Sequence, residues 1–276
     1  MKKITLLFSF LLLLNCQDYG QLKLITDLPK TLNEVSGTET TLNSELIWML
    51  NDGGNKPKLY GVSTNGKIKK EVAIKAKNKD WEDLTSDDDG NIYIGDFGNN
   101  YSKRKNLVIL KVDKKYLDEK NAEVEKIEFK YPNQTKFPPK KKQLFFDAEA
   151  FFYFNNYLYV FTKSRVKNKF GKTSLYKIPA KAGKYTAEFI SEFENCNDLQ
   201  CWITSADISP DGKKVALLSQ KNILIFSDFK NDNFLSGKIE TISLKHNSQK
   251  EGICFKNDKT LLITDEKAHG SGGNLY

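Results

Sequence analysis

The chain has 276 residues with 43 basic and 35 acidic side chains, and this length suits one large domain or two small ones. Its excess of positive charge is mild and is not accompanied by a nucleic-acid-binding motif, which argues against a nucleic-acid partner. Much of the charge lies in the segments 136–142 and 163–172. We interpret both as solvated loops; the alternative is that they contact an anionic surface or polymer.

The first predicted element is an export signal at residues 1–20. A basic start is followed by an apolar run of about eleven residues, which is too short to span a bilayer and suits a secretory signal. The run ends in Leu-Leu-Asn-Cys at Cys16, which resembles a bacterial lipoprotein cleavage box; ordinary cleavage near Gly20 is the alternative. A lipidated Cys16 would tether the protein to a membrane by its acyl chains alone. We therefore expect an exported protein, either periplasmic or anchored to the outer membrane as a lipoprotein.

After residue 20, one pattern recurs five times at intervals of roughly 45 to 65 residues. A strand-like run with acidic or polar first residues is followed by a second apolar run that ends in polar residues. The first runs begin near Asn33, Trp81, Ala148, Ser205 and Lys250, and the second runs cover 47–52, 92–96, 158–163, 215–220 and 261–266. Turn-forming sequences such as 87–91 and 209–213 separate the two runs, which predicts hairpins.

Two further strand-like runs follow in most units, and repeats of four short strands predict an all-β fold, a β-propeller. The third and fourth strands are expected at 59–62 with 68–74, 107–112 with 124–131, 174–178 with 187–193 and 223–226 with 239–244. The prediction is thus a single domain, 21–276, of five four-stranded blades. Because the last unit is short, the N-terminal strand at 21–28 is expected to complete it and close the ring. Six blades are the alternative, since the second interval is about twenty residues longer than the others.

Four of the five units carry Glu at the same place, at Glu34, Glu82, Glu149 and Glu251. The fourth unit has Ala206 there. Because the innermost strand of each blade lines the axis of a propeller, we predict that these glutamates meet at one mouth of the channel. Carboxylates held together repel unless a cation compensates them, and a divalent ion such as calcium accepts carboxylate oxygens. The alternative is an architectural role, in which each Glu accepts backbone hydrogen bonds from the next blade.

Further polar side chains are predicted to line the channel and bind a ligand. Some lie at the ends of the second runs, some offer neutral amide oxygens, and three are cations suited to an anionic substrate. The predicted ligand-binding residues are Asp52, Asp96, Asn99, Asn100, Arg104, Lys163, Arg165, Asp207 and Asp265. Whether the protein is an enzyme stays open: a metal-dependent hydrolase of phosphate esters or lactones and a purely structural or protein-binding propeller are the alternatives to a binding module.

The cysteines suggest one local disulfide. Cys196 and Cys201 flank a polar loop, and export permits them to pair; two free thiols are the alternative. Cys254 lies in an apolar run, where a buried free thiol is expected. The only histidines, His246 and His269, are not adjacent to the cysteine pair in sequence, which argues against a zinc site there.

Five stretches stand out for their composition: Asn-Glu-Val-Ser-Gly at 33–37, Asp-Trp-Glu-Asp-Leu at 80–84, Gly-Asp-Phe-Gly-Asn-Asn at 95–100, Asp-Ala-Glu-Ala at 147–150 and Lys-Glu-Gly-Ile at 250–253. These stretches resemble the exported bacterial propellers grouped as SdiA-regulated-like. The resemblance implies a calcium-associated or metal-lined propeller. We expect its partner to be a small anionic molecule or a cell-envelope component. A more distant similarity to regucalcin-like lactonases and propeller phytases implies a metal in the axial channel and ester hydrolysis.

Overall fold

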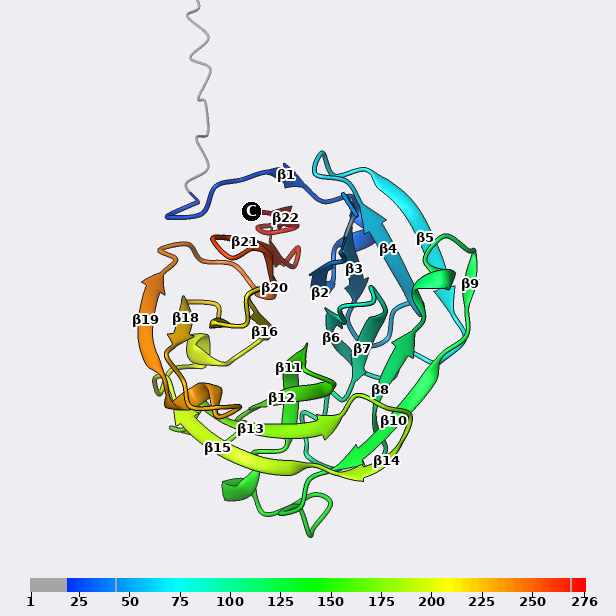
Figure 1. The fold of residues 1–276 in the computed structure, drawn as a ribbon. Helices are drawn as coiled ribbons and strands as arrows, with labels where there is room; N and C mark the ends of the chain where they lie inside the picture. Colours follow the sequence, from blue (N-terminus) through cyan, green and yellow to red (C-terminus); the bar gives the residue numbers. More distant parts are fainter. Residues whose placement is uncertain (1–18, 43, 269) are drawn as a thin grey trace, which may run out of the picture.

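The computed structural model describes residues 19–42, 44–268 and 270–276, and their strands form five sheets arranged as the blades of a ring (Figure 1). Blade 1 contains β2 (Val35–Thr40), β3 (Ile47–Asn51), β4 (Lys58–Val62) and β5 (Ile68–Ile74). Blade 2 contains β6 (Trp81–Ser86), β7 (Ile92–Asp96), β8 (Leu107–Val112) and β10 (Glu125–Lys130). Blade 3 contains β11 (Asp147–Phe154), β12 (Tyr157–Lys163), β13 (Lys172–Pro179) and β15 (Glu188–Glu194). Blade 4 contains β16 (Ser205–Ile208), β17 (Lys214–Leu218), β18 (Asn222–Ser227) and β19 (Lys238–Ser243).

Blade 5 combines the two ends of the described chain. It contains β20 (Lys250–Asn257), β21 (Thr260–Asp265) and β22 (Asn274–Leu275), and its outermost strand is β1 (Thr26–Asp27). Thr26 pairs with Leu275 and Asp27 with Asn274 in antiparallel register. The five-bladed propeller and its closure by the N-terminal strand are therefore confirmed, although that strand is shorter than the predicted segment 21–28.

The strands nearest the axis are buried along most of their length, whereas the outermost strands are not. The inner strands β2, β6, β11, β16 and β20 contact one another around the axis. The second strands are also enclosed, because blades pack against both of their faces; β3 and β7 are buried at every position. On the rim, β19 is almost wholly exposed. The continuous apolar runs of the second strands follow from burial on two faces.

Apolar clusters fill the interfaces between blades and hold the ring together. Between blades 2 and 3, for example, the rings of Phe97 and Phe151 meet edge to face with centroids 5.2 Å apart, and both are fully buried. Similar clusters join blades 1 and 2, blades 3 and 4, blades 4 and 5, and blades 5 and 1. Burial of this apolar surface, worth about 25 cal/mol per Å², drives the blades together.

Two short strands cross from one blade to the next. β9 (Asn121–Ala122), which lies between β8 and β10 in sequence, pairs in parallel with β5 of blade 1. β14 (Gly183–Thr186), which lies between β13 and β15, pairs in parallel with β10 of blade 2. The extra length of the second unit thus supplies β9 and the loop after β10, and it adds no sixth blade to the described structure.

Within the residues that the structure describes, no helix has the length and apolar character needed to cross a membrane. The predicted signal covers residues 1–20, of which residues 1–18, including the lipidation site Cys16, lie outside the described residues.

Candidate functional site

The repeated glutamates coincide with a backbone irregularity of the inner strands. A β-bulge interrupts the pairing of β6 between Trp81 and Leu84, that of β11 between Ala148 and Ala150, and that of β20 between Lys250 and Gly252. Glu82, Glu149 and Glu251 lie in these bulges. β2 has a bulge just after Glu34, whereas β16, which carries Ala206, pairs with β17 without a register shift. Because a bulge re-aims the side chain at the extra position, the recurring Glu marks a recurring bulge.

The structure brings three carboxylates together at the starts of the inner strands. One oxygen each of Asp52, Asp80 and Glu82 lies within 4.8 Å of the others. Asp52 follows β3, and Asp80 and Glu82 flank the start of β6. Four glutamates were predicted to be the ligands: Glu34, Glu82, Glu149 and Glu251. In the described structure, no three of them bring carboxylate oxygens within 4.8 Å of one another. We call this end of the channel, with its surrounding acids, the carboxylate mouth.

Two glycines allow the backbone to approach these acids closely. A Cβ on Gly98, in the loop after β7, would overlap Glu82 Oε1 and lie 2.6 Å from Asp80 Oδ2. A Cβ on Gly53, in the loop after β3, would lie 2.7 Å from Asp80 Oδ1. A side chain at either position would push the carboxylates apart, so both loops need glycine to leave the three acids in place.

The Glu82 carboxylate is buried without a hydrogen-bond donor. Its residue is 5% exposed, and no donor in the described part of the chain bonds its carboxylate. Burial raises the pKa of Glu82 well above its usual range, and the charges of Glu149 and Asp52 raise it further. Burial also raises the pKa of Asp80 to about 6, with Asp52 contributing. Arg104 Nη1 is the nearest cation to Asp80, at 3.9 Å. The three acids are therefore poorly compensated by the protein itself.

Glu149, in contrast, is fully engaged by cations. Lys163 Nζ lies 2.5 Å from its Oε2 and Arg165 Nη2 lies 2.9 Å from its Oε1. Arg165 also pairs with Asp147 through Nε at 2.6 Å. Even so, burial raises the pKa of Glu149 to about 7, because these cations only partly offset desolvation. Two of the three predicted anion-binding cations are thus held by carboxylates of blade 3.

Arg104, the third of these cations, organises the loop after β7. Its Nη2 lies 2.7 Å from Asp96 Oδ1, and its Nη1 donates to the carbonyl of Gly98 at 2.7 Å. Asn99 accepts from the Arg104 backbone through Oδ1 at 2.9 Å, and its own backbone donates to Asp147 at 2.6 Å. Asp96, Asn99 and Arg104 thereby fix the position of Gly98 beside the acids.

Blade 5 adds Glu251 and Glu266 to the carboxylate mouth. Burial raises the pKa of Glu251 to about 8 although the charge of Lys163 opposes this. Burial and the charge of Asp52 raise the pKa of Glu266 to about 7. The neighbouring predicted residue Asp265 has a structural role instead, since it accepts from Tyr276 Oη at 2.8 Å.

Glu34 and Asn100 lie at the edge of this mouth. Glu34 is exposed and accepts from Asn55 Nδ2 at 2.5 Å. Asn100 Oδ1 accepts from Arg165. The predicted neutral oxygen of Asn100 is therefore engaged by an arginine.

A disulfide and an aromatic ring border the same mouth. Cys196 and Cys201 are joined, with their Cα atoms 5.6 Å apart, and the 3₁₀ helix η4 (Leu199–Cys201) leads directly into Trp202. The Trp202 ring lies under both cations of Glu149, at 5.0 Å from Lys163 Nζ and 4.7 Å from Arg165 Cζ. Sequence reasoning did not identify Trp202 or Asp80 as site residues; Asp80 was nevertheless visible in the Asp-Trp-Glu-Asp stretch.

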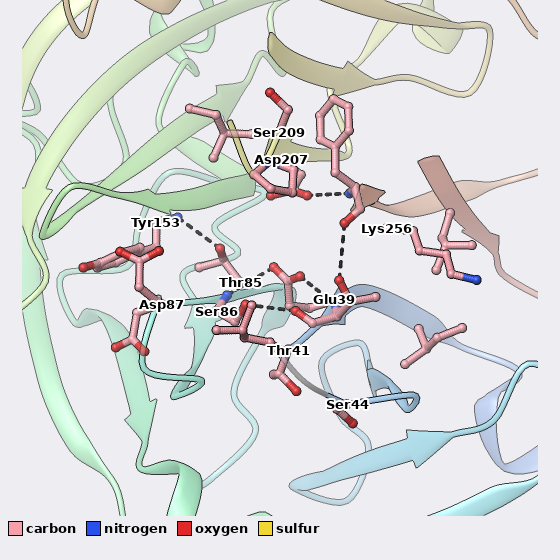
Figure 2. Close-up of a pocket in the computed structure, with 18 of the residues that line it drawn as sticks. Glu39, Thr41, Ser44, Thr85, Ser86, Asp87, Tyr153, Asp207, Ser209 and Lys256 are labelled. Carbon is pink, nitrogen blue, oxygen red and sulfur yellow. Dashed lines mark hydrogen bonds between the residues drawn. The ribbon is translucent and has the colours of Figure 1, made fainter. Parts of the chain in front are cut away.

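A large cavity opens at the other end of the inner strands (Figure 2). It has a volume of about 980 Å³ and is lined by the C-terminal ends of the inner strands of all five blades. Glu39, Thr85 and Asp207 face it from three different strands. The predicted ligand-binding residue Asp207 therefore lies at this cavity and not at the carboxylate mouth, because it sits at the end of β16 whereas the glutamates sit at strand starts.

The two buried acids of the cavity connect neighbouring inner strands. Glu39 accepts from its neighbour Thr40 N at 2.6 Å and from Ser86 N of blade 2 at 3.1 Å. Asp207 accepts from Phe255 N of blade 5 at 2.6 Å. Burial raises the pKa of Asp207 to about 7, and burial together with the charge of Asp207 raises that of Glu39. Cys254, in the apolar cluster between blades 5 and 1, is a buried free thiol as predicted.

Comparisons with known proteins found similarity to solved structures only. A comparison with family models found no match, and neither did a comparison with curated proteins. Among solved structures, the chain is similar to virginiamycin B lyase from Staphylococcus aureus, with a TM-score of 0.43, 15% identity, and 90% of this chain and 67% of that chain covered. It is also similar to a chain of a nidogen/laminin complex, with a TM-score of 0.48, 10% identity, and coverage of 84% and 72%. The Dos1 propeller gives a TM-score of 0.44, 12% identity, and coverage of 83% and 52%.

Proposed function

We propose that the protein is an exported cell-envelope β-propeller that binds a divalent cation, calcium in the first place, at Asp52, Asp80 and Glu82. The observation that carries the proposal is the convergence of three carboxylate oxygens within 4.8 Å around the buried Glu82 carboxylate, which no donor among the described residues bonds. Hard divalent cations prefer carboxylate oxygens, and calcium tolerates irregular geometry. A cation there would supply the charge compensation that the surrounding residues lack.

The residues around the three acids fit this role. Gly53 and Gly98 leave room for the acids to converge, and Arg104 holds the Gly98 loop without approaching Asp80 closer than 3.9 Å. Lys163 and Arg165 keep Glu149 neutralised, so it does not compete for the ion. The proposed ligand set therefore differs from the predicted ring of four glutamates: it keeps Glu82 and replaces the other three with two aspartates.

The resemblance to SdiA-regulated-like propellers supports the same site. Its two most specific stretches, 80–84 and 95–100, contain Asp80, Glu82 and Gly98. A bound calcium would also leave coordination positions for an anionic ligand, small or part of the cell envelope, beside Trp202. Export, to the periplasm or to the outer membrane through a lipidated Cys16, completes the proposal. Labelling with a radioactive fatty acid, in the wild type and in Cys16→Ser, tests the lipid anchor.

Thermal melting of the chelator-treated protein with added calcium tests the cation site. Binding to the folded state at 100 times Kd adds about 2.7 kcal/mol, which raises Tm by on the order of 5–10 °C. Glu82→Gln should abolish the rise. Glu34→Gln is the matched control, because it removes one mouth charge of the same kind without touching the three converging acids, and it should retain most of the rise.

Two results would overturn the proposal. One is a Tm that does not respond to calcium, magnesium or manganese. The other is an equal loss of response in Glu34→Gln and Glu82→Gln, which would indicate diffuse charge screening and no defined site. Assays with phosphomonoester, phytate and lactone substrates in the same samples separate a binding module from a hydrolase: turnover lost on chelation and in Glu82→Gln would establish the hydrolase.

A further inference from the structure

We propose that the cavity at the C-terminal ends of the inner strands is a second binding site, specific for a small organic cation that carries an ammonium group. This site is separate from the carboxylate mouth, because the two lie at opposite ends of the same inner strands. Its volume of about 980 Å³ is at the upper end of the range for small-molecule pockets, about 300–1,000 Å³.

The charges that line the cavity select for a cation. Six acidic residues line it against two lysines: Glu39, Glu45, Asp87, Asp88, Asp207 and Asp211 against Lys69 and Lys256. The innermost acids, Glu39 and Asp207, are 5% and 7% exposed. In the described structure neither forms an ion pair with a lysine or arginine; backbone N–H groups are their hydrogen-bond donors. Buried carboxylates that face a cavity without a cationic partner leave an unmet demand for positive charge.

Buried hydroxyl groups at the cavity wall favour a ligand that can form hydrogen bonds. Thr41 is 8% exposed, lines the cavity, and has no hydrogen-bond partner for its hydroxyl among the described residues. Thr85, 2% exposed, accepts from Tyr153 N at 3.0 Å, and its own O–H has no acceptor in the described chain. Both hydroxyls can therefore form a further hydrogen bond at the wall of the cavity.

Aromatic side chains complete an environment that suits an alkylammonium ion. Tyr153, Phe154 and Phe255 line the cavity beside the acids. Tyr153 is held in place by stacking on Tyr93, with ring centroids 5.8 Å apart. Aromatic faces attract organic cations, and they also pack against the methylene groups that such ligands carry.

A metal ion fits this cavity less well than an ammonium group. Within the described residues, Glu39 and Asp207 are not part of any group of three ligand side chains with oxygens within 4.8 Å, whereas the carboxylate mouth contains one. Calcium takes six or more oxygen ligands. An ammonium group needs fewer partners, because it has three N–H donors and each can bond a different acceptor. Two carboxylates in a cavity whose wall also carries hydroxyls therefore match the ammonium group.

The test compares 1,5-diaminopentane with 1,5-pentanediol, which has the same length and no charge. Isothermal titration calorimetry with the wild-type protein should give a Kd of about 1 mM or tighter for the diamine and no measurable binding for the diol. Asp207→Asn and Glu39→Gln should each weaken diamine binding by about tenfold or more. Asp89→Asn is the matched control, because Asp89 is an exposed acid of the same turn that does not line the cavity, and it should change Kd by less than about threefold.

NMR chemical shifts of the wild-type protein keep the proposal testable even if the buried variants fold poorly. The diamine should shift the amide signals of Ser86 and Phe255, and saturating calcium should leave its Kd unchanged. Equal effects of the diamine and the diol would overturn the proposal, as would the absence of binding at concentrations near 10 mM. Displacement of the diamine by calcium would overturn it too, because it would place the amine at the carboxylate mouth.

Discussion

The ion pair between Lys163 and Glu149 provides the sharpest test of the charge distribution at the carboxylate mouth. The two atoms lie 2.5 Å apart, and each side chain is only 8% exposed. Removing one partner of a buried pair costs about 3–5 kcal/mol, because the other charge is left buried and uncompensated. Since Arg165 still contacts Glu149 at 2.9 Å, we expect Lys163→Met to cost about 3 kcal/mol, the lower end of that range.

The cost of this substitution should also depend on pH. The pKa of Glu149 is about 7 with Lys163 in place, and the loss of the lysine raises it further. At low pH the carboxyl is protonated in both proteins, so the variant loses less; as pH rises through 7, the wild type holds the carboxylate with two cations and the variant with Arg165 alone. The stability difference should therefore grow from pH 6 to pH 8.

Urea unfolding at both pH values measures the difference directly, and a thermal scan should show a loss of roughly 6–12 °C in Tm. Lys58→Met is the matched control: its pair with Glu71 spans 2.8 Å, but the side chains are 31% and 47% exposed. That change should cost less than about 1 kcal/mol. The reasoning is refuted if Lys163→Met costs no more than the control, or if its cost is the same at pH 6 and pH 8.

Three other predictions follow from the site. Gly98→Ala should lower calcium affinity by about tenfold or more in calorimetry, because its Cβ would displace the Glu82 and Asp80 carboxylates; an affinity equal to that of the wild type would contradict the proposed site. In the wild type without metal, the free energy of unfolding should decrease as pH rises from 5 to 8. The reason is that Glu149 and Glu266, with folded-state pKa values of about 7, and Glu251, with a value of about 8, keep protons that the unfolded chain has lost. An increase in the free energy of urea unfolding over this range would contradict these pKa shifts. Replacing Cys196 and Cys201 by Ser should cost about 2 kcal/mol, as expected for a short closed loop, and an unchanged urea midpoint would show that the disulfide does not stabilise the fold.

The blade architecture could be predicted from the sequence because propeller strands are punctuated clearly. Apolar runs such as 47–52 and 92–96 are continuous because their strands are buried on both faces, and turn sequences such as 209–213 separate them. The strands β9 and β14 were not predicted. They have two and four residues and pair in parallel at the rim, which is too short for a periodic pattern in the sequence. Their position depends on the neighbouring blade and not on their own composition.

The site was predicted only in part, for a related reason. The recurrence of Glu82, Glu149 and Glu251 could be read from the sequence, but side-chain partners could not. Glu149 is paired because Lys163 and Arg165 end the adjacent strand and begin the loop that follows it. Glu82 has no such neighbours and meets Asp80 and Asp52 across two loops. The geometry between blades decides which acids share a cation. The sequence of a single repeat unit does not encode this geometry.

The crossing strands β9 and β14 have a consequence for how the ring comes apart. Their backbone hydrogen bonds join blade 1 to blade 2 and blade 2 to blade 3. In the described chain, no such strand joins the blades at the other three interfaces. Local opening follows the weakest boundaries. Amide hydrogen exchange should therefore be slowest across blades 1 to 3, while blades 4 and 5 detach first under partial denaturation. The propeller then behaves as a rigid arc of three blades with a hinged arc of two.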